Sequence, residues 1–244
     1  MKADSIERRP HAVLDLRSRR WKALKIEHLL GLSTQERPLK LLEIGTGSGG
    51  IAHYFGTHDS LRCEVTAVDV CDQRLVRDGY AFKLVQGSSL PFTDSRFDVV
   101  ITNHVLEHVG DTELQVEHLR EVCRVLRTDG VGYLAVPNRW MVVEPHYRLA
   151  FLSWLPSALR TPYLRTMRRG RYYDCNPPSL TTLERMLSHA GLQYENLCIR
   201  ALRETFAIEG ARGVLARLAS QLPDTVLVRL SPISPTLIYR VTRE

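Results

Sequence analysis

The stretch LLEIGTGSGG, residues 41–50, decides how the surrounding chain is expected to fold. An apolar run ends at Glu43 and Ile44, and in the loop that follows glycine occupies four of the six positions from 45 to 50. Glycine adopts positive φ at little cost and has no side chain, so such a loop turns sharply and lets a ligand approach its backbone. A helix after the loop would present free N–H groups to a carboxylate or a phosphate. We therefore expect a strand, a binding loop and a helix that together hold a nucleotide-like cofactor.

Composition excludes several classes of protein. The chain has 244 residues, of which 44% are hydrophobic and 25% charged, as is typical of one soluble globular domain with or without an insertion. No apolar run reaches the length needed to cross a bilayer, and residues 1–20 lack the apolar centre of a signal peptide. The five cysteines are widely spaced without a C-x-x-C pair, which indicates reduced thiols in a cytoplasmic protein.

Positive charge is concentrated in one segment. Residues 139–174 contain seven arginines against two acids, so most of the net charge of +6 lies there, and the segment also has seven aromatic residues. We interpret residues 139–178 as an insert that forms a lid over an apolar acceptor. Turned outward, the same residues would rest on an anionic membrane surface. Nucleic acid is the less expected partner, because a run of charges is usually a solvated face.

Short runs rich in β-branched residues alternate with helical patterns along the chain. This alternation implies a parallel sheet with helices on both faces. We expect one domain over residues 1–244 with an N-terminal helical segment at 1–35, and a capping box, Thr181-x-x-Glu184, opening one of the later helices. Strands are expected at 39–44, 63–70, 82–86, 97–102, 131–136, 193–199 and 236–242, and helices at 111–127, 181–191 and 210–219.

The glycine loop alone fits two kinds of cofactor. Gly45-x-Gly47-x-x-Gly50 with Asp69 about 20 residues further on also matches the fingerprint of dinucleotide-binding oxidoreductases. However, the carboxylate of Glu43 would repel a pyrophosphate and attract the ammonium group of a methionine. The sequence also has a single mononucleotide-type half. Both observations favour S-adenosylmethionine.

Further motifs in the expected order narrow the choice to one family. The blocks are LEIGTGSG at 42–49, VDV at 68–70, QGSSLPF at 86–92, FDVVITNHVLEHV at 97–109 and LRTDGV at 126–131. With them the sequence resembles the class I S-adenosylmethionine-dependent methyltransferases that act on small molecules, of the methyltransferase type 11-like kind. The resemblance implies an α/β fold with a Rossmann-like, doubly wound, seven-stranded sheet. Such a sheet is mostly parallel with an antiparallel last strand, and here a helical or loop lid would follow the fifth strand.

The resemblance also implies which residues hold S-adenosylmethionine. Asp69 would bind the ribose hydroxyls, and Asn103 and His104 would lie beside the sulfonium. After Gly87, many relatives carry an acid where this chain has serines, so a backbone contact is expected to help hold the adenine. The expected cofactor residues are Glu43, Gly45, Gly47, Gly49, Asp69, Val70, Ser88, Ser89, Leu90, Asn103 and His104.

Two other motifs resemble sites that the chain is not expected to have. His104-x-x-Glu107-His108 matches the H-x-x-E-H pattern of inverted zinc peptidases. It begins where the fourth strand ends and has no evident third ligand, so we expect no metal. The sequence NPPS at 176–179 resembles a motif of methyltransferases that act on bases, but it lies far from the fourth strand and lacks the stacking aromatic residue.

The chemistry suggests where catalytic residues lie. Methyl transfer from a sulfonium is an in-line displacement in which the protein aligns the acceptor and excludes water. An oxygen acceptor usually needs a base, and His108 and His146 are the candidates. Glu144, Tyr147 and Arg148 are candidate acceptor-binding residues. We expect O-methylation of a small or lipid-linked metabolite. The alternatives are N- or C-methylation, or a non-catalytic cofactor-binding module that docks a partner through the insert.

Overall fold

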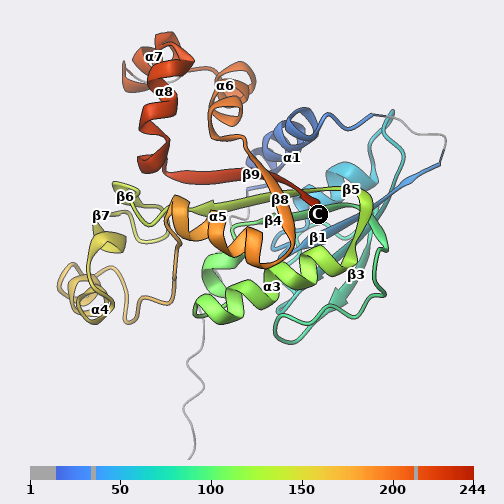
Figure 1. The fold of residues 1–244 in the computed structure, drawn as a ribbon, viewed down its shortest axis with the longest axis horizontal. Helices are drawn as coiled ribbons and strands as arrows, with labels where there is room; N and C mark the ends of the chain where they lie inside the picture. Colours follow the sequence, from blue (N-terminus) through green and yellow to red (C-terminus); the bar gives the residue numbers. More distant parts are fainter. Residues whose placement is uncertain (1–14, 34–36, 212–213) are drawn as a thin grey trace, which may run out of the picture.

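The computed structural model describes residues 15–33, 37–211 and 214–244 of the chain. One sheet of seven strands lies at its centre, in the order β3-β2-β1-β4-β5-β9-β8 (Figure 1). The strands are β1 (Leu39–Ile44), β2 (Cys63–Asp69), β3 (Ala81–Leu84), β4 (Phe97–Asn103), β5 (Leu126–Pro137), β8 (Leu192–Asn196) and β9 (Thr236–Arg243).

The strand directions confirm the predicted topology. Strands β1 to β5 are parallel, and β9 runs antiparallel between β5 and β8. The strand order reverses between the adjacent strands β1 and β4. Doubly wound sheets bind ligands beyond the carboxyl ends of their strands at such a reversal. The fold therefore directs attention to the edge at which β1, β2, β4 and β5 end.

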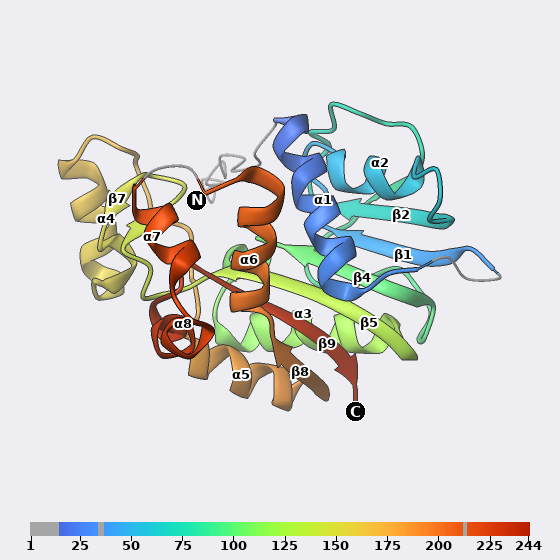
Figure 2. The same ribbon diagram turned by 90° about the horizontal axis from the view of Figure 1, so that it is seen from above.

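Helices cover both faces of the sheet (Figure 2). Helices α1, α2 and α6 lie on one face, and α3 and α5 lie on the other. Successive side chains of a strand point to opposite faces of the sheet. Leu41 accordingly packs with α1 and α2, while Leu42 packs with Val122 of α3. This explains why the strands read as continuous apolar runs. The covering helices are α1 (Leu16–Leu30), α2 (Gly50–Gly56), α3 (Thr112–Val125), α5 (Leu180–His189) and α6 (Cys198–Glu209).

The predicted end of α3 is wrong by two residues. The helix begins after Asp111, as expected, since the Asp111 side chain accepts a hydrogen bond from the first turn. It ends at Val125 rather than at 127. Leu126 is already extended and pairs with Phe97, so tertiary strand pairing stops the helix before its apolar periodicity ends.

The capping box predicted at Thr181 is also wrong. The N-cap is Ser179, whose hydroxyl accepts a backbone hydrogen bond, and α5 starts at Leu180. Glu184 does not return to the helix start, because its carboxylate accepts a hydrogen bond from the hydroxyl of Tyr239 at 2.8 Å. The sequence pattern therefore places the N-cap of α5 two residues too far along the chain.

The chain between β8 and β9 is more helical than expected. The strand predicted to reach 199 ends at Asn196, whose side chain accepts a hydrogen bond from Cys198 N and turns the chain into α6. Gly210, at φ 75°, ends α6 inside the range where a single helix was predicted. The remaining elements are α7 (Val214–Gln221), α8 (Asp224–Leu230) and the 3₁₀ turn η3 (Ser231–Ile233).

In the N-terminal segment predicted to be helical, α1 starts after Asp15, which caps it, and ends at Gly31. The parts of this prediction at 1–14 and 34–35 lie outside the described residues. None of the helices in the described ranges is long and apolar enough to cross a membrane.

The insert at 139–178 has a small core of its own, set apart from the sheet (Figure 1). The side chain of Asn138 fixes its base by donating to the carbonyls of Pro232 (2.8 Å) and Ser234 (2.9 Å). The elements of the insert are β6 (Val143–Glu144), β7 (Leu149–Ala150), η2 (Leu152–Trp154) and α4 (Ser157–Thr166). Its core residues are Leu149, Leu152, Leu164, Tyr173 and Cys175.

An ion pair between a buried carboxylate and an exposed arginine connects the start of β4 to the chain before β1. Asp98 is 8% exposed and accepts hydrogen bonds from both terminal nitrogens of Arg37, at 2.7 and 2.6 Å, and from Lys40 N at 2.8 Å. The hydrogen bonds from Arg37 hold the pKa of Asp98 below its ordinary value. This pair therefore stabilises the fold fully above the ordinary pKa of an aspartate, and the contribution is lost as the pH falls through the lowered pKa.

Asp98→Asn is expected to lower the free energy of unfolding by about 2 kcal/mol at neutral pH, because charge-assisted hydrogen bonds to a buried carboxylate are lost. The difference from wild type should shrink in acid, where both proteins lack the charge. Urea unfolding at both pH values measures this. The control is Asp129→Asn, which removes an exposed carboxylate paired with Arg127 and should lower the free energy of unfolding much less. Equal losses in the two variants would contradict the assignment.

Candidate active site

The glycine loop between β1 and α2 has the conformation that its sequence predicts. Gly45, Gly47 and Gly49 have φ values of 73°, 54° and 80°, all in the left-handed region. A Cβ atom at Gly45 would collide with Val105, and one at Gly49 would collide with Tyr80. The loop therefore depends on glycine both for its turn and for the close approach of its neighbours.

The buried side chain of Glu43 anchors this loop through hydrogen bonds. Its side chain is buried, and Oε2 accepts hydrogen bonds from the hydroxyl of Thr46 at 2.6 Å and from Ala52 N at 3.0 Å. Burial raises the pKa of Glu43 to about 8, although these two hydrogen bonds act to lower it. The carboxyl group thus links β1, the loop and α2, and any contact with a cofactor would pass through the loop.

Asp69, at the end of β2, faces the same loop. Its carboxylate accepts hydrogen bonds from Gly47 N at 2.9 Å and from Cys71 N at 3.2 Å. Val70, the next residue, is 67% exposed, an unusual position for a valine that offers an apolar surface beside the carboxylate. An acceptor for hydroxyl groups and an apolar surface are what a ribose and an adenine require.

The segment predicted to flank the adenine is anchored by residues that the sequence reading missed. Ser88 is half-buried, Ser89 is exposed and Leu90 is buried. Leu90 N donates to Glu121 at 2.7 Å, and its carbonyl accepts from Arg124 at 3.0 Å. Both partners lie on α3 and also pair with each other, so helical i, i+3 spacing is the signal that could have found them.

Asn103 ends β4, and His104 follows it directly, close to the glycine loop. Asn103 is 8% exposed, and its Oδ1 is a buried acceptor without a hydrogen-bond partner among the described residues. His104 has φ 58°, and its backbone N–H donates a hydrogen bond to the carbonyl of Ala135 at 2.8 Å. An unpaired buried acceptor at this edge fits a ligand that brings a donor, such as an ammonium group. The cradle and its acceptors therefore fit S-adenosylmethionine.

The two predicted bases lie side by side. The insert returns to the sheet where Asn176 N donates to the carbonyl of Glu107 at 2.7 Å. This brings the ring of His146 to 5.4 Å from that of His108, measured between centroids. Sγ of Cys175 lies 3.8 Å from Nδ1 of His108 and 4.0 Å from Nδ1 of His146. Cys175 was not predicted, and burial raises the pKa of its thiol well above the ordinary value.

Glu144 holds His146 in place. Its Oε1 lies 2.7 Å from Nδ1 of His146, and its Oε2 accepts a hydrogen bond from Tyr147 N at 2.7 Å. Burial acts to lower the pKa of His146, but Glu144 outweighs it and holds the pKa above its ordinary value. Two of the three predicted acceptor-binding residues thus belong to this cluster. Arg148 is exposed at φ 54°, and no side-chain contact between it and the cluster is found in the described part of the chain.

Glu107 is the unexpected member of the site. Its side chain is fully buried, yet neither carboxylate oxygen has a hydrogen-bond partner among the described residues. Oε1 lies 3.4 Å from Nδ1 of His104 and 3.8 Å from Nε2 of His108. Burial acts to raise the pKa of Glu107, but the two histidines outweigh it and hold the pKa below its ordinary value. The site therefore contains a fully buried carboxyl group between two histidines.

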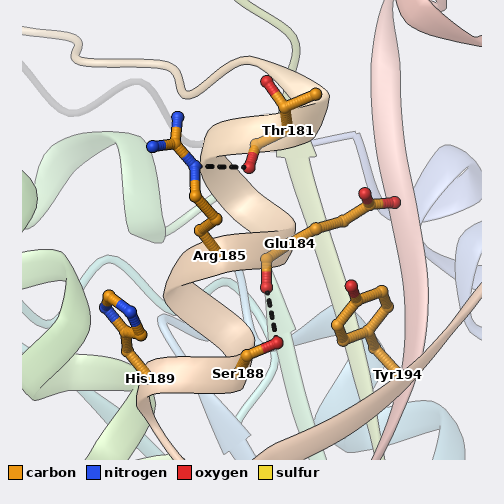
Figure 3. A pocket seen from close by; sticks show the side chains of 6 residues that line it. All are labelled: Thr181, Glu184, Arg185, Ser188, His189 and Tyr194. Carbon is orange, nitrogen blue, oxygen red and sulfur yellow. Dashed lines mark hydrogen bonds between the residues drawn. The ribbon is translucent and has the colours of Figure 1, made fainter.

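A separate surface hollow lies on α5 beside β8 (Figure 3). Its two drawn hydrogen bonds, Arg185 to the carbonyl of Thr181 and Ser188 to the carbonyl of Glu184, stay within one helix. It contains none of the residues predicted to bind a cofactor or an acceptor.

Comparison with known proteins agrees with the site. A family profile described as a methyltransferase domain matches residues 8–197. A probable S-adenosylmethionine-dependent methyltransferase of Mycobacterium tuberculosis is 35% identical over 107 residues, covering 41% of this chain and 36% of that protein. Norajmaline N-methyltransferase of Rauvolfia serpentina is 27% identical over 99 residues, covering 37% and 33%. The alignments thus span about a third of the length of these curated relatives.

Solved structures share the fold at low sequence identity. A putative methyltransferase of Haloferax volcanii, solved with the Trm112 activator, has a TM-score of 0.54 at 17% identity, covering 93% of this chain and 92% of that one. The YcgJ protein of Bacillus subtilis has a TM-score of 0.53 at 17% identity, covering 91% and 99%. The family profile, the glycine loop and the strand order agree: the chain belongs to the class I S-adenosylmethionine-dependent methyltransferases.

Proposed function

We propose that this protein methylates a hydroxyl group of a small or lipid-linked metabolite. The observation that carries the proposal is the pair of histidines, His108 and His146, beside the carboxyl ends of β4 and β5, with Glu144 in contact with His146. A hydroxyl group has to lose its proton to become a good nucleophile, whereas an uncharged amine attacks through its nitrogen lone pair and loses a proton afterwards. A carboxylate–histidine pair next to the cofactor edge therefore favours oxygen.

S-adenosylmethionine supplies an activated methyl group when bound. Asp69 would hold the ribose hydroxyls, the loop from Gly45 to Gly49 would lie under the methionine part, and Oδ1 of Asn103 would accept from its ammonium. Held in this way, the cofactor would lie at the same edge of the sheet as the histidine pair. The acceptor oxygen would form its bond to the methyl carbon as the carbon–sulfur bond breaks, and its proton would be taken up at His146.

Small acceptors are known among proteins of this fold. The solved neighbours include a geranyl diphosphate methyltransferase in complex with geranyl diphosphate (TM-score 0.52) and a Haemonchus contortus N-methyltransferase in complex with phosphomonomethylethanolamine (TM-score 0.53). Another neighbour is the [4+2]-cyclase SpnF (TM-score 0.51), so the fold alone does not imply methyl transfer.

Transfer of a labelled methyl group tests the proposal. Protein mixed with methyl-tritiated S-adenosylmethionine and an extract is expected to label the small-molecule or lipid fraction. Label in protein or nucleic acid would contradict the acceptor class. Cofactor binding without any labelled product would favour the non-catalytic module.

Exposed side chains on the insert support a peripheral membrane contact. Apolar and aromatic side chains that monomeric proteins usually bury are between 38% and 53% exposed here. Exposed arginines follow directly at 165, 168, 169 and 171. Exposed apolar and basic residues in one segment match what an anionic lipid layer binds. The exposed residues are Trp140, Val142, Val143, Phe151, Trp154, Leu159, Met167 and Tyr172.

Vesicle sedimentation tests this contact. The protein should bind vesicles containing phosphatidylserine and not those of phosphatidylcholine alone. Exchanging Arg168 and Arg169 for glutamate should weaken binding at least about tenfold, since each basic residue near the surface contributes about 1 kcal/mol. The matched control exchanges Arg120 and Arg185, exposed on α3 and α5, for glutamate. If both double variants bind alike, the insert is not the contact.

A further inference from the structure

The buried carboxylate of Glu107 needs a positively charged or hydrogen-bonding partner. A charge removed from water is costly unless it is paired and hydrogen-bonded. Neither oxygen of Glu107 makes a hydrogen bond among the described residues, and the nearest histidine nitrogens are at 3.4 and 3.8 Å. Such a group, aimed into the active site, points to a ligand with positive charge.

The neighbours of Glu107 provide the remaining ligand atoms for a metal ion. One ligand atom from each of Glu107, His108 and His146 lies within 4.8 Å of the other two. Two imidazoles and one carboxylate are a donor set that suits zinc and other divalent first-row ions and leaves coordination positions open. The side chains of His108 and His146 are 25% and 11% exposed, so the cluster is reachable from solvent.

The groups behind these histidines match the usual surroundings of metal ligands. A metal-binding histidine commonly donates its other ring N–H to a carboxylate, which fixes the ring and its tautomer. Glu144 stands in this relation to His146, at 2.7 Å from Nδ1. On the far side of His108, Nδ1 faces Sγ of Cys175 at 3.8 Å. Donation from Nδ1 would leave the lone pair of each ring on Nε2.

We propose that Glu107, His108 and His146 bind a divalent first-row transition-metal ion in the active site. The inference rests on the proposed function, because the open positions of the ion would take the acceptor oxygen. A metal-bound hydroxyl loses its proton to water more readily than a free one. The histidines would then act through the ion rather than as bases.

Calorimetric titration of this whole chain, freed of metal by a chelator, tests the site. Zn²⁺ and Mn²⁺ are the probes, and a single ion per chain is expected to bind. Glu107→Gln keeps the shape of the side chain and should weaken binding at least about tenfold. The control is Glu113→Gln, on the exposed face of α3, which should bind the ions as wild type does.

Thermal unfolding shows whether the variant is folded and whether the ion stabilises it. The ion should raise the Tm of wild type and leave that of Glu107→Gln unchanged. Absence of saturable binding of both ions to wild type, or wild-type binding in Glu107→Gln, would overturn the site. The outcome for the proposed function is separate. If methyl transfer persists in chelator, the proposed function stands and the ion has no part in it. If the ion binds but no methyl group is transferred, the metal site stands and the proposed function is wrong.

Discussion

Asp69→Ala is expected to weaken binding of S-adenosylhomocysteine at least about 100-fold, since it removes an ionised acceptor of two hydrogen bonds worth about 1.5–3 kcal/mol each. The carboxylate also accepts from Gly47 N, so its loss would release the loop that lies under the cofactor. Asp69→Asn keeps the shape and one acceptor oxygen, and an intermediate affinity is expected. Isothermal titration calorimetry measures all three proteins.

Asp78→Ala is the matched control for this effect. Asp78 lies in the loop after β2, and its side chain is 74% exposed. Affinity in this variant should equal that of wild type. If Asp69→Ala binds S-adenosylhomocysteine within a few-fold of wild type, the ribose contact assigned to Asp69 is wrong.

His146→Ala is expected to lower kcat by about 100- to 1,000-fold, the range of a lost general base, with cofactor affinity unchanged. Glu144→Gln should cost less, because Glu144 orients the ring and does not take the proton itself. Turnover is measured with the acceptor fraction labelled in the transfer experiment, and thermal unfolding checks that the variants fold.

His189→Ala serves as the control for the histidine exchange. His189 lies at the exposed end of α5, in the separate hollow of Figure 3, and its loss should leave turnover unchanged. Unchanged turnover in His146→Ala would remove this residue from catalysis. A loss in His146→Ala fits both a base and a metal ligand, and turnover in the presence of chelator separates the two.

The sheet could be predicted because its signals are local. The β1 strand, at 39–44, coincides with its prediction, since a largely apolar run and the glycine loop after it mark its limits. Of the three helices before β9, α7 overlaps the helix predicted at 210–219, whereas α6 and α8 were not predicted. Their boundaries depend on Asn196, which turns the chain after β8, and on Gly210, neither of which interrupts an apolar pattern in the sequence.

The site was less predictable because it depends on contacts between distant segments. His108 and His146 were selected separately by residue type, and only the fold of the insert brings their rings together. The H-x-x-E-H pattern was set aside for want of a third ligand. The sequence could not show that His146 lies near Glu107 and His108, because this depends on how the insert returns to the sheet, where Asn176 N donates to the carbonyl of Glu107.

The central claim is that the site where β1, β2, β4 and β5 end methylates an oxygen atom of the acceptor. The most direct test is ¹³C NMR of the product formed with S-adenosylmethionine carrying a ¹³C-labelled methyl group, because the chemical shift of a methyl carbon reports the atom to which it is attached. We predict an enzyme-dependent methoxyl signal in a small or lipid product, absent with His146→Ala. A signal from a methyl group on nitrogen or carbon, or no enzyme-dependent signal, would contradict the account.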